Sequence, residues 1–235
     1  TGSRPSESGD KAVAGVADIR DARFDTLVKM YTPKKDVPAR INLQLLPKIE
    51  SDSIREGKIF TDISRMDALC HVVRAFKDDS VYHASGSIDP VRDIESVNSE
   101  LIMHDLIFIE KRCERIEAAR KRKADAKLDA EDALLARMKS HLEQDLCLRT
   151  FDLTEEEEKL VSGYPFITAK QMLIVLNVSD SAIRDSALME KLGASLTKLN
   201  IEIMQVSAKL EAEISMLESD EEKKEFMEDA GIVQP

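Results

Sequence analysis

Residues 172 to 180 read MLIVLNVSD, an apolar run of strand length that leads into polar side chains. Such a run is typical of a parallel strand buried on both faces, although a short buried helix can have the same composition. A glycine and a proline precede the run, and Ser179 and Asp180 offer turn and N-cap chemistry before a helical stretch near 182 to 192. The flanking residues therefore predict a β-to-α unit.

Polar residues follow two neighbouring strands of this predicted arrangement. Asn177 and Asp180 follow the first strand, and Ser207, Ala208 and Lys209 follow a second strand, expected at 201 to 206. In open α/β sheets, ligands bind at the carboxyl ends of the strands. A carboxamide, a carboxylate and loop amides at one sheet edge suit the donor and acceptor groups of a purine base. Taken singly, Asn177 is equally well explained as a turn residue and Asp180 as an N-cap.

The remaining α/β pattern is read from hydrophobic periodicity. Its order of strands and helices predicts an α/β fold with a three-layer, mostly parallel sheet. The expected strands are 12–19, 40–46, 68–76, 172–177 and 201–206, and the expected helices are 21–31, 52–65, 151–161, 182–192 and two after residue 208.

A long helical segment interrupts this pattern. From residue 92 to 148 there is no glycine or proline, and apolar residues recur at helical intervals. The polar stretch 121–132 is the expected reversal, which predicts an inserted antiparallel helical hairpin, a coiled coil. We therefore expect a nucleotide-binding α/β domain formed by 1–91 and 151–235, with the hairpin at 92–150.

The tip of the expected hairpin is basic, with Arg120, Lys121, Arg122 and Lys123 in succession. On a chain with a net charge of −11, this is a local reversal of sign. Two interpretations stay open: a solvated helix face, or a surface that docks on an acidic partner.

Composition restricts the function classes. The acidic balance argues against DNA as a partner, and no apolar stretch approaches the ~20 residues that span a bilayer. We expect a soluble, cytoplasmic protein. The three cysteines have no C-x-x-C spacing, so neither a disulfide framework nor a zinc site is indicated. The glutamates at 155–158 fit the first turn of a helix better than a metal site.

Several segments, in order, resemble the YchF-type Obg-like ATPases, a branch of the P-loop nucleotide hydrolases. They are PKKDVPA, DALCHVVRAFKDDSVYHASGSIDPVRDIESVNSELI, LTEEEEKLV, ITAKQMLIVLNVSD and QVSAKLEAEI, and the resemblance covers most of residues 12–235. It implies that Asn177 and Asp180 occupy the N-x-x-E base-reading motif, with Asp for Glu, which is linked to adenine rather than guanine preference. It also implies that Ser207, Ala208 and Lys209 form the S-A-K loop behind the base, and that the hairpin is the family's coiled-coil arm.

The sequence departs from this family at the phosphate site. No G-x-x-x-x-G-K-[ST] motif occurs, and the position of the family's D-x-x-G reads LLPK at 45–48. The family's carboxy-terminal TGS domain is not matched. We therefore expect no catalytic or metal-binding residue in this chain, and Mg²⁺ only if a P-loop lies upstream.

Two functions remain. The first is an Obg-like domain that binds a purine nucleotide, ATP or GTP, in ribosome-associated regulation. Phosphate positioning dominates phosphoryl transfer, so hydrolysis should be impaired; an upstream P-loop would reverse that expectation to an active ATPase or GTPase. The alternative is a non-enzymatic interaction module that docks through the basic hairpin tip.

Overall fold

The computed structural model describes residues 13–19, 21–46, 58–81, 83, 85–122, 125–217 and 219–230. The chain divides into two compact units, Thr1–Glu50 and Ser51–Pro235.

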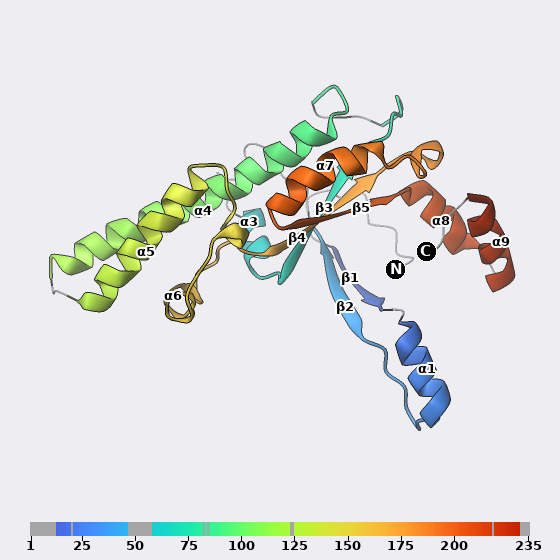
Figure 1. Cartoon of the computed structure of the whole chain (residues 1–235), viewed down its shortest axis with the longest axis horizontal. Coiled ribbons are helices and arrows are strands. Elements are labelled where there is room, and N and C mark those ends of the chain that lie inside the picture. Colours follow the sequence, from blue (N-terminus) through green and yellow to red (C-terminus); the bar gives the residue numbers. More distant parts are fainter. Residues whose placement is uncertain are drawn as a thin grey trace. The chain divides into compact units, whose positions relative to one another are not determined.

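The first unit contains a two-stranded antiparallel sheet (Figure 1). Strand β1, Val13–Asp18, pairs with β2, Arg40–Leu45, in a continuous register. Helix α1, Ala22–Tyr31, lies between them in sequence and begins at Asp21, whose carboxylate accepts from the backbone N–H of Arg23 at 2.9 Å. This aspartate is a good N-cap because it satisfies an orphan N–H of the first helical turn.

The second unit contains a three-stranded parallel sheet of order β3-β4-β5. The strands are β3, Ala68–Arg74, β4, Gln171–Asn177, and β5, Ile201–Val206. The central strand β4 carries the apolar run that predicted it, and Ile174 and Leu176 on it are fully buried. The prediction of an α/β fold with parallel strands is confirmed for this unit.

The expectation that all five strands share one mostly parallel sheet is wrong for the described residues. β1 and β2 form a separate sheet and run antiparallel. In β2, RINLQL alternates apolar and polar residues and exposes Ile41, Leu43 and Leu45, whereas β4 has an unbroken apolar run. Alternation of this kind fits a strand that is not covered on both faces.

The helices of the second unit near the sheet are α3, Lys58–Ser64, and α7, Ala187–Lys198. Helix α7 packs against β5. It begins five residues later than expected, because the 3-10 turn η2, Asp180–Ala182, and a non-helical stretch at 183–186 precede it. Part of the helix expected at 52–65 lies outside the described residues.

A pair of long helices follows β3 (Figure 1). α4 spans Pro90–Arg120 and α5 spans Ala126–Leu142. The ion pairs Arg112–Glu131 and Lys139–Glu110 show that the two helices run antiparallel. The reversal is shorter than the stretch 121–132 that predicted it, because Asp125 caps α5 by accepting from the N–H of Lys127. That the pair is a coiled coil, and that the inserted segment spans 92–150, remain predictions.

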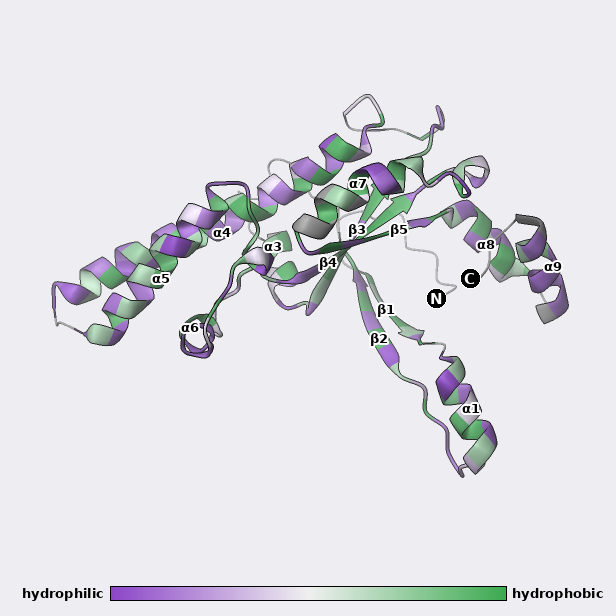
Figure 2. Cartoon of the chain, in the orientation of Figure 1, coloured by the Kyte–Doolittle hydropathy of each residue, from purple (hydrophilic) through white to green (hydrophobic). Residues whose placement is uncertain are grey.

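A hydrophobic cluster lies between these helices and the segment that follows them. Figure 2 shows hydrophobic and hydrophilic residues intermixed along α4 and α5, as expected for helices with one buried face. The cluster contains Ile102, Ile109, Ile116, Leu134, Leu135, Met138, Leu142, Cys147, Leu148, Val161 and Phe166.

Short elements complete the second unit. They are the 3-10 turn η1, Leu148–Thr150, and the helices α6, Glu155–Val161, α8, Ala208–Met216, and α9, Asp220–Ala230. Thr154 and Glu157 form a reciprocal capping box at the start of α6, which confirms the helical interpretation of the glutamate run. Among the described residues, no helix is both long and apolar enough to cross a membrane.

Candidate site at the carboxyl edge of the parallel sheet

The loops that follow β4 and β5 begin side by side. Asn177, the last residue of β4, lies opposite Val206, the last residue of β5. The N–H of Val178 donates to the carbonyl of Val206 at 2.8 Å, which extends the pairing by one bond beyond the strands. The five residues predicted to read a base are therefore placed at one edge of one sheet.

Asn177 joins three segments at this edge. Its side-chain Oδ1 accepts from the backbone N–H of Ala208 at 3.0 Å, and its own carbonyl accepts from the N–H of Ala75 at 2.8 Å. The side chain thus holds the loop after β5 and is more than a turn residue. The Ala208 amide is engaged inside the protein, so it is not part of the row of loop amides expected to face a ligand.

The Asp180 carboxylate is held from the other loop. Ser207 Oγ donates to its Oδ1 at 2.5 Å, and Lys209 Nζ donates to its Oδ2 at 3.1 Å. Ser179 occupies the N-cap position of the 3-10 turn, so Asp180 is not its N-cap. The hydrogen bond from Ser207, and then that from Lys209, lowers the pKa of Asp180 below its ordinary value. This carboxyl is therefore ionised at neutral pH.

Ser207 and Lys209 differ in exposure. Ser207 is buried, and its hydroxyl also accepts from the N–H of Leu210 at 3.3 Å, which caps α8. The Lys209 side chain is 74% exposed and reaches Asp180 across the surface. The hydrogen bond to Asp180 raises the pKa of the Lys209 ammonium, so the pair is charged on both sides.

This arrangement leaves Asp180 able to accept further hydrogen bonds. An ionised carboxylate has about four lone-pair sites, and the two bonds described above use two of them. The Asp180 side chain is 36% exposed, so solvent or a ligand can reach it. A carboxylate that is held by two protein donors and still exposed to solvent can accept hydrogen bonds from N–H donors such as those on the edge of a purine base.

Sequence reasoning missed Gln205, one residue before the end of β5. Its Nε2 lies 3.0 Å from the carbonyl oxygens of Ala182 and Ile183, and 3.1 Å from that of Asp185. It therefore binds the loop that carries Asp180. The sequence signal that could have identified Gln205 was a polar residue between the apolar residues at the end of the strand.

A third loop at the same sheet edge is organised by Arg74, the last residue of β3. Its guanidinium donates to the carbonyls of Phe76, Asp78 and Val81 at 2.9 to 3.1 Å. Farther along, His83 Nε2 lies 3.2 Å from Asp93 Oδ2 at the start of α4. These bonds fix the chain between β3 and α4 close to where Asn177 accepts from Ala75.

The basic residues at the turn between α4 and α5 do not form a free cluster. Arg120 donates to Asp132 at 2.8 Å, and its Nε lies 2.7 Å from Asp129, although outside hydrogen-bond geometry. Lys121 pairs with Glu117 one helical turn earlier. Arg122 is exposed, and Lys123 lies outside the described residues. Acidic neighbours thus neutralise part of the predicted docking surface.

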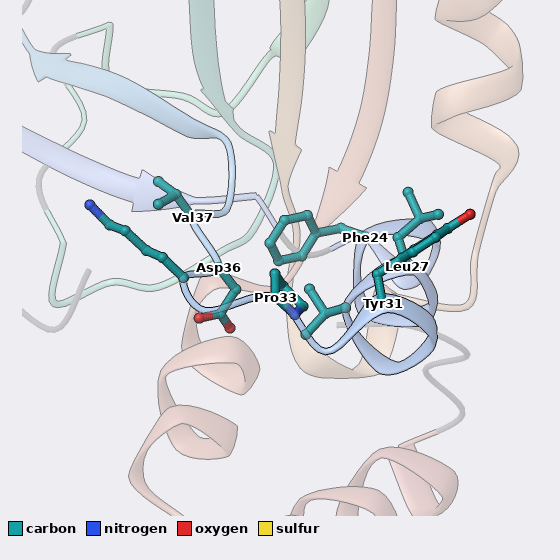
Figure 3. A pocket seen from close by; sticks show the side chains of 8 residues that line it. Phe24, Leu27, Tyr31, Pro33, Asp36 and Val37 are labelled. Carbon is teal, nitrogen blue, oxygen red and sulfur yellow. The ribbon is translucent and has the colours of Figure 1, made fainter.

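A separate apolar cavity of about 550 Å³ lies within the first unit. Figure 3 shows Phe24 of α1 close to Pro33 of the following segment, and Leu27, Tyr31 and Val37 also line the cavity. None of the predicted site residues lines this cavity. Among the described residues there is also no cluster of His, Cys, Asp and Glu that could hold a metal ion.

Comparison with known proteins agrees with the resemblance. The chain is 37% identical over 226 residues to the ribosome-binding ATPase YchF of Bacillus subtilis, covering 93% of this chain and 61% of that protein. It is 31% identical over 166 residues to Obg-like ATPase 1 of rice, covering 69% of this chain and 42% of the relative. No family model matches the chain.

The fold agrees with that of a solved relative. The YchF GTPase of Schizosaccharomyces pombe superposes with a TM-score of 0.79 at 23% identity, over 93% of this chain and 61% of that one. The chain spans about three fifths of the length of the first of these relatives and of this structure. Over the residues that it spans, the resemblance of this chain to the YchF-type Obg-like ATPase family is confirmed.

Proposed function

We propose that this chain is an Obg-like α/β domain that binds a purine nucleotide, ATP or GTP, at the carboxyl edge of its parallel sheet. The observation that carries the proposal is the Asp180 carboxylate, fixed by Ser207 and Lys209 and still open to solvent. Asn177 supports it by tying Ala208 to the end of β4. In this proposal Asp180 contacts the base, and Asn177, Ser207, Ala208 and Lys209 complete the base-binding site by holding the two loops around it.

The two candidate bases make different demands on Asp180. Guanine presents two adjacent donors, N1–H and the N2 amino group, to an acceptor pair such as a carboxylate. Adenine presents one donor, the N6 amino group, beside the N1 acceptor. Either base gives Asp180 at least one hydrogen bond, so the proposal covers both nucleotides.

The phosphates of the nucleotide receive less support from this polypeptide. Its sequence contains no G-x-x-x-x-G-K-[ST] motif, and phosphoryl transfer depends on phosphate and metal positioning. We expect the 235-residue chain by itself to bind nucleotide weakly and to hydrolyse it slowly.

The cellular role is proposed from the relatives. The Bacillus protein is named a ribosome-binding ATPase, so we propose that this chain acts in the cytoplasm, in ribosome-associated regulation. We further propose that residues 1–91 and 151–235 form the nucleotide-binding domain and that the helical pair within 92–150 is an inserted arm.

Titration calorimetry of ATP and GTP against the chain tests the nucleotide proposal. We compare the unaltered protein with Asp180→Ala and with the control Asp152→Ala, which replaces an exposed aspartate just before α6. Losing one charge-assisted hydrogen bond, worth roughly 1.5 kcal/mol, should weaken binding about tenfold in Asp180→Ala and leave the control unchanged. Equal affinities for all three proteins would remove Asp180 from the site, and no heat with either nucleotide would remove the proposal.

The alternative is an interaction module that docks through Arg120, Lys121, Arg122 and Lys123. The exposed Lys121 and Arg122 at the turn favour it, whereas the engagement of Arg120 by Asp129 and Asp132 weakens it. Docking through these cations should weaken steeply with added salt. Unchanged ribosome co-sedimentation of Lys121→Glu/Arg122→Glu across a salt series would exclude this surface.

A further inference from the structure

We propose that Gln205 is a positioning residue for Asp180, through the turn that carries it. This inference deepens the proposed function and rests on it. The Gln205 side chain crosses from β5 to the loop after β4, where its Nε2 meets the carbonyls of Ala182, Ile183 and Asp185. Its amide thereby fixes the turn from which the Asp180 carboxylate projects.

The turn that carries Asp180 is short, and within it the N–H of Ala182 donates to the carbonyl of Ser179 at 2.9 Å. The 3-10 turn η2 is one turn long, and its N-cap residue, Ser179, makes no side-chain capping bond. Short 3-10 turns have poor hydrogen-bond geometry. The Ala182 carbonyl accepts locally from the N–H of Asp185 at 3.0 Å, and Gln205 adds a second donor there and also reaches the carbonyls of Ile183 and Asp185. The Gln205 amide supplies a donor to these carbonyls from a neighbouring strand, which is what such a turn needs to keep one conformation.

The orientation of the Gln205 amide follows from its surroundings. Three carbonyl oxygens converge on one terminal atom, and the other terminal atom, Oε1, is buried with no partner in the described part of the chain. Carbonyls require a donor, so the atom that faces them is Nε2. An acceptor at that position would repel all three oxygens.

Gln205 and Asn177 form a reciprocal pair of links between the two loops. The Asn177 side chain at the end of β4 accepts from Ala208 in the loop after β5. The Gln205 side chain near the end of β5 donates to the loop after β4. Ser207 and Lys209, which follow β5, donate to Asp180, which follows β4. The position of the carboxylate is therefore fixed relative to the ends of both strands.

Two variants remove the donor in different ways. Gln205→Glu keeps the shape of the side chain but places an acceptor against the carbonyls. Gln205→Met keeps the length without adding charge, so it separates loss of the donor from electrostatic repulsion of the nucleotide. The matched control is Gln144→Glu, because Gln144 is exposed and its Nε2 donates to a single carbonyl, that of Ser140, at the end of α5.

Calorimetric titration of GTP and ATP against the full chain measures the effect. We expect both Gln205 variants to bind about tenfold more weakly than the unaltered chain and the control to bind equally well. If Gln205 acts through Asp180, adding Gln205→Met to Asp180→Ala should weaken binding no further than Asp180→Ala alone, since coupled residues are not additive. A residue that only stabilises the fold would not show this coupling.

The outcomes separate the two proposals. Weaker binding with full coupling to Asp180 supports the inference. Unchanged affinity in Gln205→Met, or losses that add to that of Asp180→Ala, would overturn it while leaving nucleotide binding standing. An unaltered chain that binds neither nucleotide would overturn the proposed function and this inference together.

Discussion

Asp105 in helix α4 and Asp180 at the sheet edge both join segments that are distant in sequence, but they do so with very different exposure. Asp105 is fully buried and accepts from the N–H groups of Ile167 and Thr168 and from the Thr168 hydroxyl, at 2.7 to 3.1 Å. Asp180 has two partners and keeps 36% of its side chain exposed. A carboxylate saturated from within is structural, whereas one fixed on one side and open on the other can serve a ligand.

A partly buried cluster around Glu131 resembles the Asp105 site, because its carboxylate is also bound by protein donors. Arg112 donates to both oxygens of Glu131, at 2.6 and 2.9 Å, and to the Tyr164 hydroxyl at 2.8 Å, while that hydroxyl donates to Glu131. Glu131 is 5% exposed, so its charge is balanced inside the protein. This cluster joins α4, α5 and the segment after α6, and it leaves little capacity for a ligand.

The largest effect on stability is expected from Asp105→Ala. It would leave the buried N–H groups of Ile167 and Thr168 without partners, at a cost of about 3 kcal/mol in the free energy of unfolding. Urea unfolding measures this, with Asp152→Ala as the exposed control. A loss below about 1 kcal/mol, the value of an ordinary hydrogen bond, would contradict the structural role of Asp105.

A smaller loss is expected from Tyr164→Phe. It removes a hydroxyl that links Arg112 and Glu131 but leaves their ion pair in place. We expect the free energy of unfolding to fall by about 1 kcal/mol. In a double-mutant cycle with Glu131→Gln, the two losses should not add; additive losses would show that the cluster does not act as a unit.

The strand ends could be predicted from the sequence because their signals are local. The apolar run of β4 and the turn residues after it identified Asn177 and Asp180, and the strand-to-helix boundary identified Ser207. The separate antiparallel sheet could not be predicted, because pairing partners depend on contacts between distant residues. The same holds for Gln205, whose partners lie twenty or more residues earlier in the chain. An aspartate within the apolar stripe of α4 was a visible but unused sign of the Asp105 bonds.

Asp180→Ala should have the smallest effect on stability. Its partners Ser207 and Lys209 retain other contacts or solvent, so we expect the free energy of unfolding to change by about 0.5 kcal/mol or less. Thermal unfolding of Asp180→Ala and Asp105→Ala, measured in parallel, compares the stability losses of the two variants. A loss as large as that of Asp105→Ala would make Asp180 a structural residue.

Nucleotide binding should depend little on pH in the neutral range. Hydrogen bonds from Ser207 and Lys209 hold the pKa of Asp180 below its ordinary value. The ionised Asp180 carboxylate is therefore present at every pH above its ordinary pKa, and it is lost only as the pH falls through the lowered pKa. We expect constant affinity from about pH 7 to about pH 5. A decline already near pH 6 would point to another titrating group at the site.

The measurement that tests the central claim most directly is a nitrogen-15 chemical-shift titration of the labelled chain with GTP and with ATP. The account predicts that the largest shift changes fall on the amides of 177–182 and 207–210, and that those of α4 and α5 stay unchanged. Saturable shifts confined to the helical pair or to the apolar cavity beside α1, with the strand-end loops unaffected, would contradict it.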